Sequence, residues 1–187
     1  MITSERNLSI DLVKIVAMYC IICLHTTMKY TDSNLGFIIY TISGLGMPLF
    51  FMVSGYLMWN RDLDYKYVFS KTFRIIKFVA IMSFIFWIVF GIRNSTGYLE
   101  IFFGSFLQQH NLAQFWYFLS IIIIYLTLPL CSLLRKRFKH FTLFFICFWG
   151  CIALFWHVLN CLGVGEMQIL QPFRIWNWFF LFSLGGV

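Results

Sequence analysis

The sequence has few charged residues, and acidic ones are scarcest. Only 11% of the 187 residues are charged, and seven Asp and Glu stand against 14 Lys and Arg. Because soluble globular domains carry roughly 25% charged residues, this composition excludes a soluble domain. The chain also lacks a glycine-rich phosphate-binding loop. The common nucleotide-binding motifs are therefore excluded as well.

The six cysteines form no strong metal or redox motif. Cys20 and Cys23 are separated by two residues, and Cys147 and Cys151 by three, which are spacings found in metal and redox sites. Most of the cysteines lie inside apolar stretches, however, where cysteine behaves as a small apolar residue. We therefore predict no metal ligands and no bound cofactor.

Apolar residues dominate what is present. Hydrophobic residues make up 61% of the chain and aromatic residues 21%, in repeated long runs. Runs of this length predict an all-α, polytopic transmembrane helical bundle with about five complete spans and a partial sixth. The predicted spans are residues 10–28, 35–59, 78–92, 115–134, 141–159 and 173–187.

The last predicted span, at about 15 residues, is too short to cross a bilayer. We therefore expect residues 1–187 to be the N-terminal part of a longer membrane domain, or a truncated gene product. A cleaved signal peptide at the start is disfavoured, because no small-x-small cleavage site follows the first apolar run.

The distribution of the basic residues predicts a topology. The net charge of +7 could indicate a nucleic-acid partner. Most of the basic residues, however, fall in two loops on one predicted side, which is the pattern of cytoplasmic loops. These residues are Arg61, Lys66, Lys71, Arg74, Lys77, Arg135, Lys136, Arg137 and Lys139. We therefore predict a cell-membrane protein with a cytoplasmic N-terminus and no nucleic-acid partner.

The first span, within Arg6 to His25, carries ionisable residues in an otherwise apolar stretch. Asp11 precedes Lys14 by three residues, close enough on a helix to pair with it. The eleven steps from Lys14 to His25 make about three turns, so both project from nearly the same face, about 16 Å apart along the axis. A charge at the centre of a membrane helix costs roughly 2.5–3.5 kcal/mol. This polar stripe therefore indicates a functional site.

A purely structural interpretation of the first span remains open. Asp11 and Lys14 could extend to the lipid headgroups, as long charged side chains do near helix ends. His25 would then only end the helix.

The second span contains a proline in its middle. Pro48 removes a backbone hydrogen bond and predicts a kink or break in the helix. Ser54 and Gly55, just beyond it, would permit close approach of another helix. A break of this kind suits a functional cavity, and packing alone is the alternative.

Four blocks of the sequence resemble the membrane acyltransferase family 3. They are RNLSIDLVKIVAMYCIICLH, MPLFFMVSGYLM, KTFRI and FWYFLSIIIIYLTLPL, in that order, between about residues 6 and 134. Members of this family O-acylate surface polysaccharides, peptidoglycan or related glycans and lipids. The family has about ten membrane spans, so the chain would supply roughly its first half.

The resemblance implies roles for particular residues. In the family, ten residues separate a basic residue, usually arginine, from a following histidine, and the two here are Lys14 and His25. Lysine lacks the bidentate fork with which arginine grips phosphate or carboxylate. The other positions that match the family are Asp11, Phe51, Ser54, Gly55, Tyr56, Lys71, Arg74 and Trp116.

The implied chemistry is acyl transfer from an acyl-CoA, with acetyl-CoA expected, to a hydroxyl of a cell-surface glycan or glycolipid. His25 is the expected catalytic base, since histidine titrates near neutral pH. His157 is the reserve candidate. Asp11, Lys14, Ser54, Tyr56 and Trp116 are expected to bind substrate. Lys71 and Arg74 would hold the phosphates of the donor. The thioester arm would then reach inward to His25.

Other functions remain open from the sequence. The basic residues before the third span could be topology determinants or contacts to anionic membrane lipid. An exporter of a glycan or small solute would also use a broken helix and intramembrane charges. An inactive fragment is the third possibility. Dependence on acyl-CoA separates the enzyme from the exporter.

Overall fold

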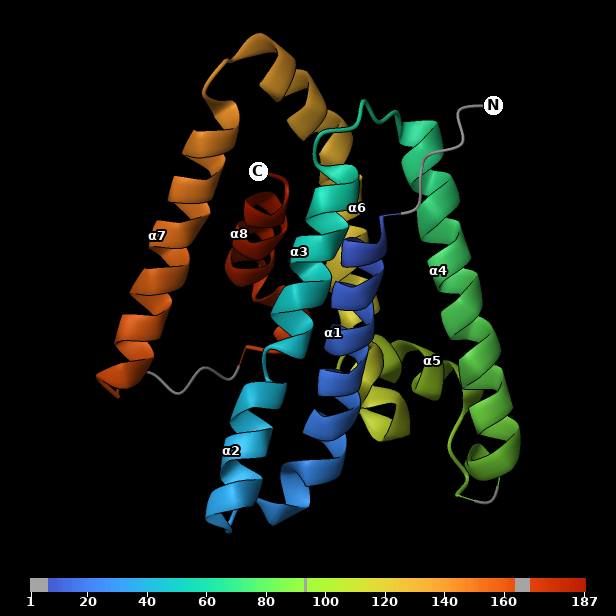
Figure 1. Cartoon of the computed structure of the whole chain (residues 1–187). Helices are drawn as coiled ribbons and strands as arrows, with labels where there is room; N and C mark the ends of the chain where they lie inside the picture. The colour runs from blue at the N-terminus through green and yellow to red at the C-terminus, as the bar shows by residue number, and fades with distance from the viewer. Residues whose placement is uncertain (1–6, 93, 164–168) are drawn as a thin grey trace. The chain divides into compact units, whose positions relative to one another are not determined.

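The chain is helical, and no strand occurs in the part that the computed structural model describes, which is residues 7–92, 94–163 and 169–187 (Figure 1). The predicted all-α class is therefore confirmed. Within the same residues, five helical stretches are long and apolar enough to cross a membrane. They are Leu8–Tyr30, Asn34–Met58, Tyr65–Gly91, Leu112–Arg137 and Phe141–Cys161. A sixth apolar helix, α8 (Ile175–Gly185), is shorter.

The helices divide into two compact units. The first comprises residues 7–60 together with Leu181–Val187, and the second comprises Arg61–Phe180. Helix α8 contributes its beginning to the second unit and its end to the first.

The first unit begins with α1 (Leu8–Thr27). Asn7 caps this helix, because its side-chain oxygen accepts hydrogen bonds from the backbone N–H groups of Ser9 (3.1 Å) and Ile10 (3.4 Å). These bonds satisfy N–H groups that the first turn of a helix leaves without partners. Only Ala17 of α1 is buried, as expected for a helix whose apolar surface faces lipid.

A break divides the second apolar stretch into two helices, α2 (Asn34–Ser43) and α3 (Gly46–Met58). A single-turn 3₁₀ segment, Met28–Tyr30, precedes α2. Pro48 lies in the first turn of α3, where its missing N–H costs no helical hydrogen bond. The predicted break is therefore confirmed, and it falls at Gly44 and Leu45, just before the proline.

Glycines bring α3 close to two other helices of the first unit. At Gly46 a Cβ would lie 2.8 Å from the backbone oxygen of Ala17 in α1, beside which α3 runs (Figure 1). On the other side of α3, a Cβ at Gly55 would overlap the backbone carbonyl of Phe182, in the last turns of α8. Small residues permit this close packing of membrane helices.

The second unit begins with α4 (Tyr65–Phe86), which continues into a wider π-helical turn, Trp87–Gly91. Helix α5 (Tyr98–Phe106) and a 3₁₀ segment, His110–Phe115, follow. The Trp87 indole donates a hydrogen bond to the Thr96 carbonyl (3.1 Å). This bond ties the π-helical turn to the segment that precedes α5. Helix α5, which contains most of the apolar patch IFFGSFL, packs against α4.

Helix α4 begins thirteen residues before Phe78, where the sequence predicts the apolar span to start. Asp64 caps it by accepting a hydrogen bond from the Tyr67 N–H (2.8 Å). Its buried positions, Val68, Thr72, Val79 and Ser83, recur at helical spacing. The basic residues between them lie on the rest of the helix surface. The basic segment is therefore mostly helix, because amphipathic periodicity extends beyond the hydropathic stretch.

Helix α6 (Trp116–Arg137) supplies the core of the second unit. Its buried side chains include Ile121, Ile124 and Leu128, and it packs against α4 and α5. Pro129 lies inside this helix. Helix α7 (Phe141–Cys161) instead buries only Phe141 and Ala153, so most of its apolar side chains are available to lipid.

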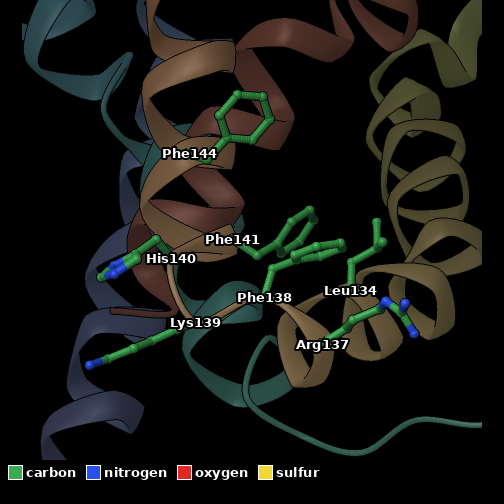
Figure 2. Close-up of a pocket in the computed structure, with 7 residues that line it drawn as sticks. All are labelled: Leu134, Arg137, Phe138, Lys139, His140, Phe141 and Phe144. Carbon is green, nitrogen blue, oxygen red and sulfur yellow. The ribbon is translucent and has the colours of Figure 1, made fainter.

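The turn between α6 and α7 borders an open pocket of about 560 Å³ (Figure 2). The residues that line it are Leu134, Arg137, Phe138, Lys139, His140, Phe141 and Phe144. The turn that carries Arg137, Lys139 and His140 therefore lines a pocket that is partly aromatic.

Candidate functional site

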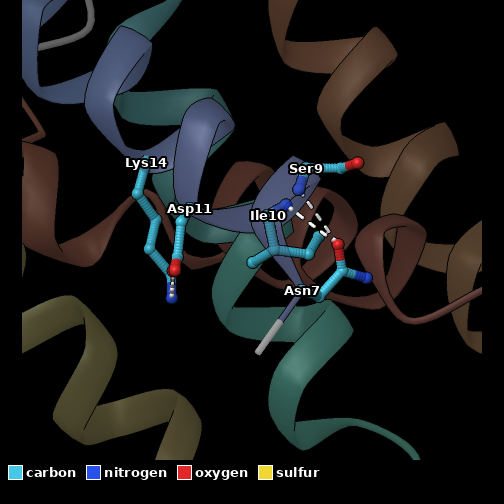
Figure 3. A network of polar contacts seen from close by, with 5 residues as sticks. All are labelled: Asn7, Ser9, Ile10, Asp11 and Lys14. Carbon is cyan, nitrogen blue, oxygen red and sulfur yellow. Dashed lines mark hydrogen bonds and ion pairs between the residues drawn. The ribbon is translucent and has the colours of Figure 1, made fainter. Parts of the chain in front are cut away.

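The polar residues of α1 form the predicted pair. Lys14 Nζ lies 3.3 Å from Asp11 Oδ1, one turn away on the same helix (Figure 3). The side chains are 39% and 27% exposed, respectively. An ion pair at this spacing keeps both charged groups satisfied in an apolar helix.

His25 lies in the last turn of α1, and its side chain is exposed. It makes no hydrogen bond or ion pair with any residue that the structure describes, so its imidazole is accessible. The structure does not bring His25 into contact with Asp11 or Lys14. They share a helix and, by its geometry, nearly the same face.

Ser54 and Tyr56 lie on α3 on either side of Gly55. Ser54 is half-buried, whereas Tyr56 is 53% exposed. Residues two apart on a helix are separated by about 200° around its axis, so these two side chains point to nearly opposite sides. The structure therefore does not place both predicted substrate-binding residues at one site.

The predicted donor-binding residues lie one turn apart on α4, in the second unit. Lys71 Nζ is 5.5 Å from the centroid of the Tyr67 ring, a cation–π distance. Arg74 is exposed, and its guanidinium lies 3.4 Å from the Ser70 hydroxyl. Because residues three apart on a helix are neighbours, this face presents two cations that one phosphate group could meet together.

Trp116, which opens α6, belongs to an aromatic and polar cluster. Its ring centroid lies 5.2 Å from that of Trp178, and the Trp178 indole donates a hydrogen bond to the Gln171 carbonyl (2.7 Å). The Gln171 backbone N–H in turn donates to Gln108 Oε1 (2.6 Å). These contacts join the start of α6 to the start of α8, which makes Trp116 a packing residue in addition to a candidate for substrate binding.

Two contacts between acidic and basic side chains of the described residues do not follow from the sequence. The carboxylate of Glu100 on α5 lies 3.5 Å from Nε2 of His110. Gln108 and His110 have positive φ angles of 59° and 57°, and the reversal between α5 and the following 3₁₀ segment brings the pair together. The sequence does not indicate this contact. A reversal of this kind usually has glycine at its positive-φ positions, and here those positions are Gln108 and His110.

The second unpredicted contact ties the loop before α4 to the end of α6. Asp62 Oδ1 lies 2.9 Å from Lys136 Nζ and 3.4 Å from the Ser132 hydroxyl. The hydrogen bond from Lys136, assisted by its charge, outweighs desolvation and lowers the pKa of Asp62 below its usual value of 3.8. Asp62 therefore joins this loop to α6 in addition to offsetting part of the positive charge of the loop.

The Asp62 contact predicts a small pH-dependent contribution to stability. A carboxylate whose pKa is lowered by folding stabilises the fold above its unfolded pKa, and this contribution disappears as the pH falls through the folded pKa. We expect Asp62→Asn to lower the apparent Tm slightly at pH 7. Tryptophan-monitored melting should show the difference from the unaltered protein shrinking as the pH falls below 3.8, the usual pKa of the carboxyl, through the lower pKa of the folded state. A difference in Tm that stays constant as the pH falls from 7 into the range where the carboxyl is protonated would show that charge is not its cause.

Comparison with known protein families identifies a relationship. A family model described as an acyltransferase domain, that of acyltransferase family 3, matches residues 7–187. Neither the curated proteins nor the solved structures contain a match.

Proposed function

Because the chain belongs to acyltransferase family 3, we propose that it is a membrane O-acyltransferase that uses acyl-CoA, with acetyl-CoA the first candidate. With five apolar helices of spanning length in the described part, the chain is a multi-pass membrane protein. We place it in the cell membrane with its N-terminus in the cytoplasm, on the strength of its basic loops. The acceptor we propose is a hydroxyl of a cell-surface glycan or glycolipid.

The observation that carries this proposal is the family match across almost the whole chain. The matched residues include α1, the helix that carries both the Asp11–Lys14 pair and an accessible His25. His25 acts as the base. It removes the proton of the acceptor hydroxyl as the oxygen attacks the thioester carbonyl. The new C–O bond replaces the C–S bond, and CoA leaves as the thiol after accepting a proton.

The donor is assigned to Lys71 and Arg74. CoA is a polyanion, and charge-assisted hydrogen bonds from cations to phosphate are the strongest that side chains make. Arg74 is exposed on α4, and its described side-chain hydrogen bond is a long one, 3.4 Å, to the uncharged hydroxyl of Ser70. Its guanidinium can therefore turn to a phosphate at little cost.

Acetyl-CoA binding by the purified protein in nanodiscs tests the donor assignment. We expect Arg74→Gln to weaken binding by about tenfold or more, the loss of one hydrogen bond to a charged group. His25→Ala should leave binding unchanged, because the base acts only on the acceptor. Isothermal titration calorimetry gives the affinities.

Lys66→Gln is the matched control. Lys66 is an exposed cation on the same helix, and its removal changes the net charge by the same amount. Equal weakening of acetyl-CoA binding in both variants would mean that the overall positive charge of α4 attracts CoA. A specific site at Arg74 would then be excluded. A folded protein without measurable acetyl-CoA binding would contradict the donor assignment and favour the solute-exporter alternative.

A further inference from the structure

The basic cluster at the end of α6 divides into two groups. Lys136 pairs with Asp62 at 2.9 Å, and the guanidinium of Arg135 donates to the Arg61 carbonyl at 3.4 Å. These two cations are thus held by the loop that precedes α4. Their neighbours in the sequence have a different environment.

Arg137, Lys139 and His140 border the pocket between α6 and α7. Within the described parts of the chain, no carboxylate lies at ion-pair distance from any of the three. Figure 2 shows Arg137 extending from the α6 side, and Lys139 and His140 extending on the other side of the turn. Positive charge that has no carboxylate partner among the described residues therefore flanks the pocket.

Aromatic and aliphatic side chains form the rest of the pocket. Phe138 and Phe141 lie together between the two helices, with Leu134 beside them and Phe144 one turn further along α7 (Figure 2). Phe138 is 53% exposed and Phe144 is 65% exposed. The pocket thus joins an apolar surface to cationic groups.

The pocket lies where two helices of membrane-spanning length meet. One such stretch ends at Arg137 and the next begins at Phe141, so the turn between them lies at a bilayer surface. His140, at the N-cap position of α7, makes no side-chain hydrogen bond to the first turn. The partial positive charge of that helix terminus adds to the attraction for an anion.

We propose that this pocket binds an anionic phospholipid. Its phosphate would interact with Arg137, Lys139 and the first turn of α7, and its acyl chains would cover Phe138 and Phe144. A soluble anion would satisfy the charges but would not cover these aromatic side chains. Basic pockets between transmembrane helices are typical anionic-lipid sites. The inference goes beyond acyl transfer and does not depend on it.

Native mass spectrometry of the detergent-solubilised whole chain tests the proposal. The probes are 1-palmitoyl-2-oleoyl phosphatidylglycerol and the corresponding phosphatidylcholine, titrated separately. We expect one phosphatidylglycerol to bind at least fivefold more tightly than phosphatidylcholine. The double substitution Arg137→Gln/Lys139→Gln should remove the preference, because each cation near the headgroups contributes about fivefold.

The control is Lys66→Gln/Lys136→Gln, which removes the same charge from outside the pocket. It should keep the preference for phosphatidylglycerol. Equal losses in the two double variants would overturn the proposal, since they would mean that net charge alone attracts the lipid. Displacement of the bound phosphatidylglycerol by equimolar acetyl-CoA would also overturn it, because the pocket would then belong to the acyl donor.

A second pair of variants tests the apolar part without changing any charge. Phe144→Ala should weaken phosphatidylglycerol binding severalfold, whereas Leu143→Ala should not. Leu143 is as exposed as Phe144 (63% and 65%) but lies outside the pocket. Unchanged binding in Phe144→Ala would overturn the assignment of the acyl chains to this surface.

Discussion

Replacing His25 with alanine is expected to reduce acyl transfer by at least two orders of magnitude while the protein stays folded. Loss of a general base costs typically 10²–10⁴-fold in rate. Because the imidazole is exposed and contacts no other described side chain through a hydrogen bond or ion pair, its removal leaves no buried partner unsatisfied. The measurement is transfer of radiolabelled acetyl groups from acetyl-CoA to envelope glycan in membranes that contain the protein.

His157→Ala is the matched control for this experiment. His157 is also an exposed histidine on an apolar helix, near the end of α7, and is the reserve candidate for the base. Its variant should transfer acetyl groups at the unaltered rate. If His157→Ala were inactive and His25→Ala active, the base would be assigned to α7. Unchanged transfer in both variants would exclude a catalytic histidine at either position.

Substitution of Gly55 by alanine is expected to destabilise the first unit strongly. A Cβ at this position overlaps the backbone carbonyl of Phe182, and a backbone carbonyl cannot move aside as a flexible side chain can. Overpacking costs about 1–3 kcal/mol. We therefore expect the apparent Tm in detergent, followed by intrinsic tryptophan fluorescence, to fall by about 3–10 °C.

The control is Gly97→Ala, because a Cβ at Gly97 would meet no atom within 4 Å. Gly97 has an extended conformation that alanine adopts readily, with φ −71° and ψ 147°. Its variant should melt within about 2 °C of the unaltered protein. A Gly55→Ala protein with the unaltered Tm would show that α3 and the end of α8 can separate without loss of stability.

The candidate site could be predicted from the sequence as far as local geometry reaches. The Asp11–Lys14 pair follows from a spacing of three on one helix, and the break before Pro48 follows from the backbone chemistry of proline. The direction of Ser54 relative to Tyr56 also follows from helical spacing. The family resemblance places the two residues in one block, whereas the helix directs their side chains to nearly opposite sides.

The basic segment before Phe78 shows the limit of reasoning from hydropathy. A window average finds apolar residues and stops at the first charges, whereas the helix begins at the Asp64 cap and continues as long as one face is buried. The buried positions Val68 and Thr72 carry that periodicity across the basic residues. Lys71 and Arg74 thereby gain a fixed relation to each other that a loop would not provide.

By itself, the sequence determined the helical class, the membrane-spanning stretches and the polar pair on α1, because each depends on composition or on residues within one or two turns. Only the tertiary structure decided which glycines are close-packed, that Glu100 meets His110, and that Trp116 packs on Trp178. It also decided that Asp62 binds Lys136 while Arg137 borders a pocket. These contacts join residues ten to more than a hundred positions apart. No local periodicity encodes them, since they form only when packed helices bring distant segments together.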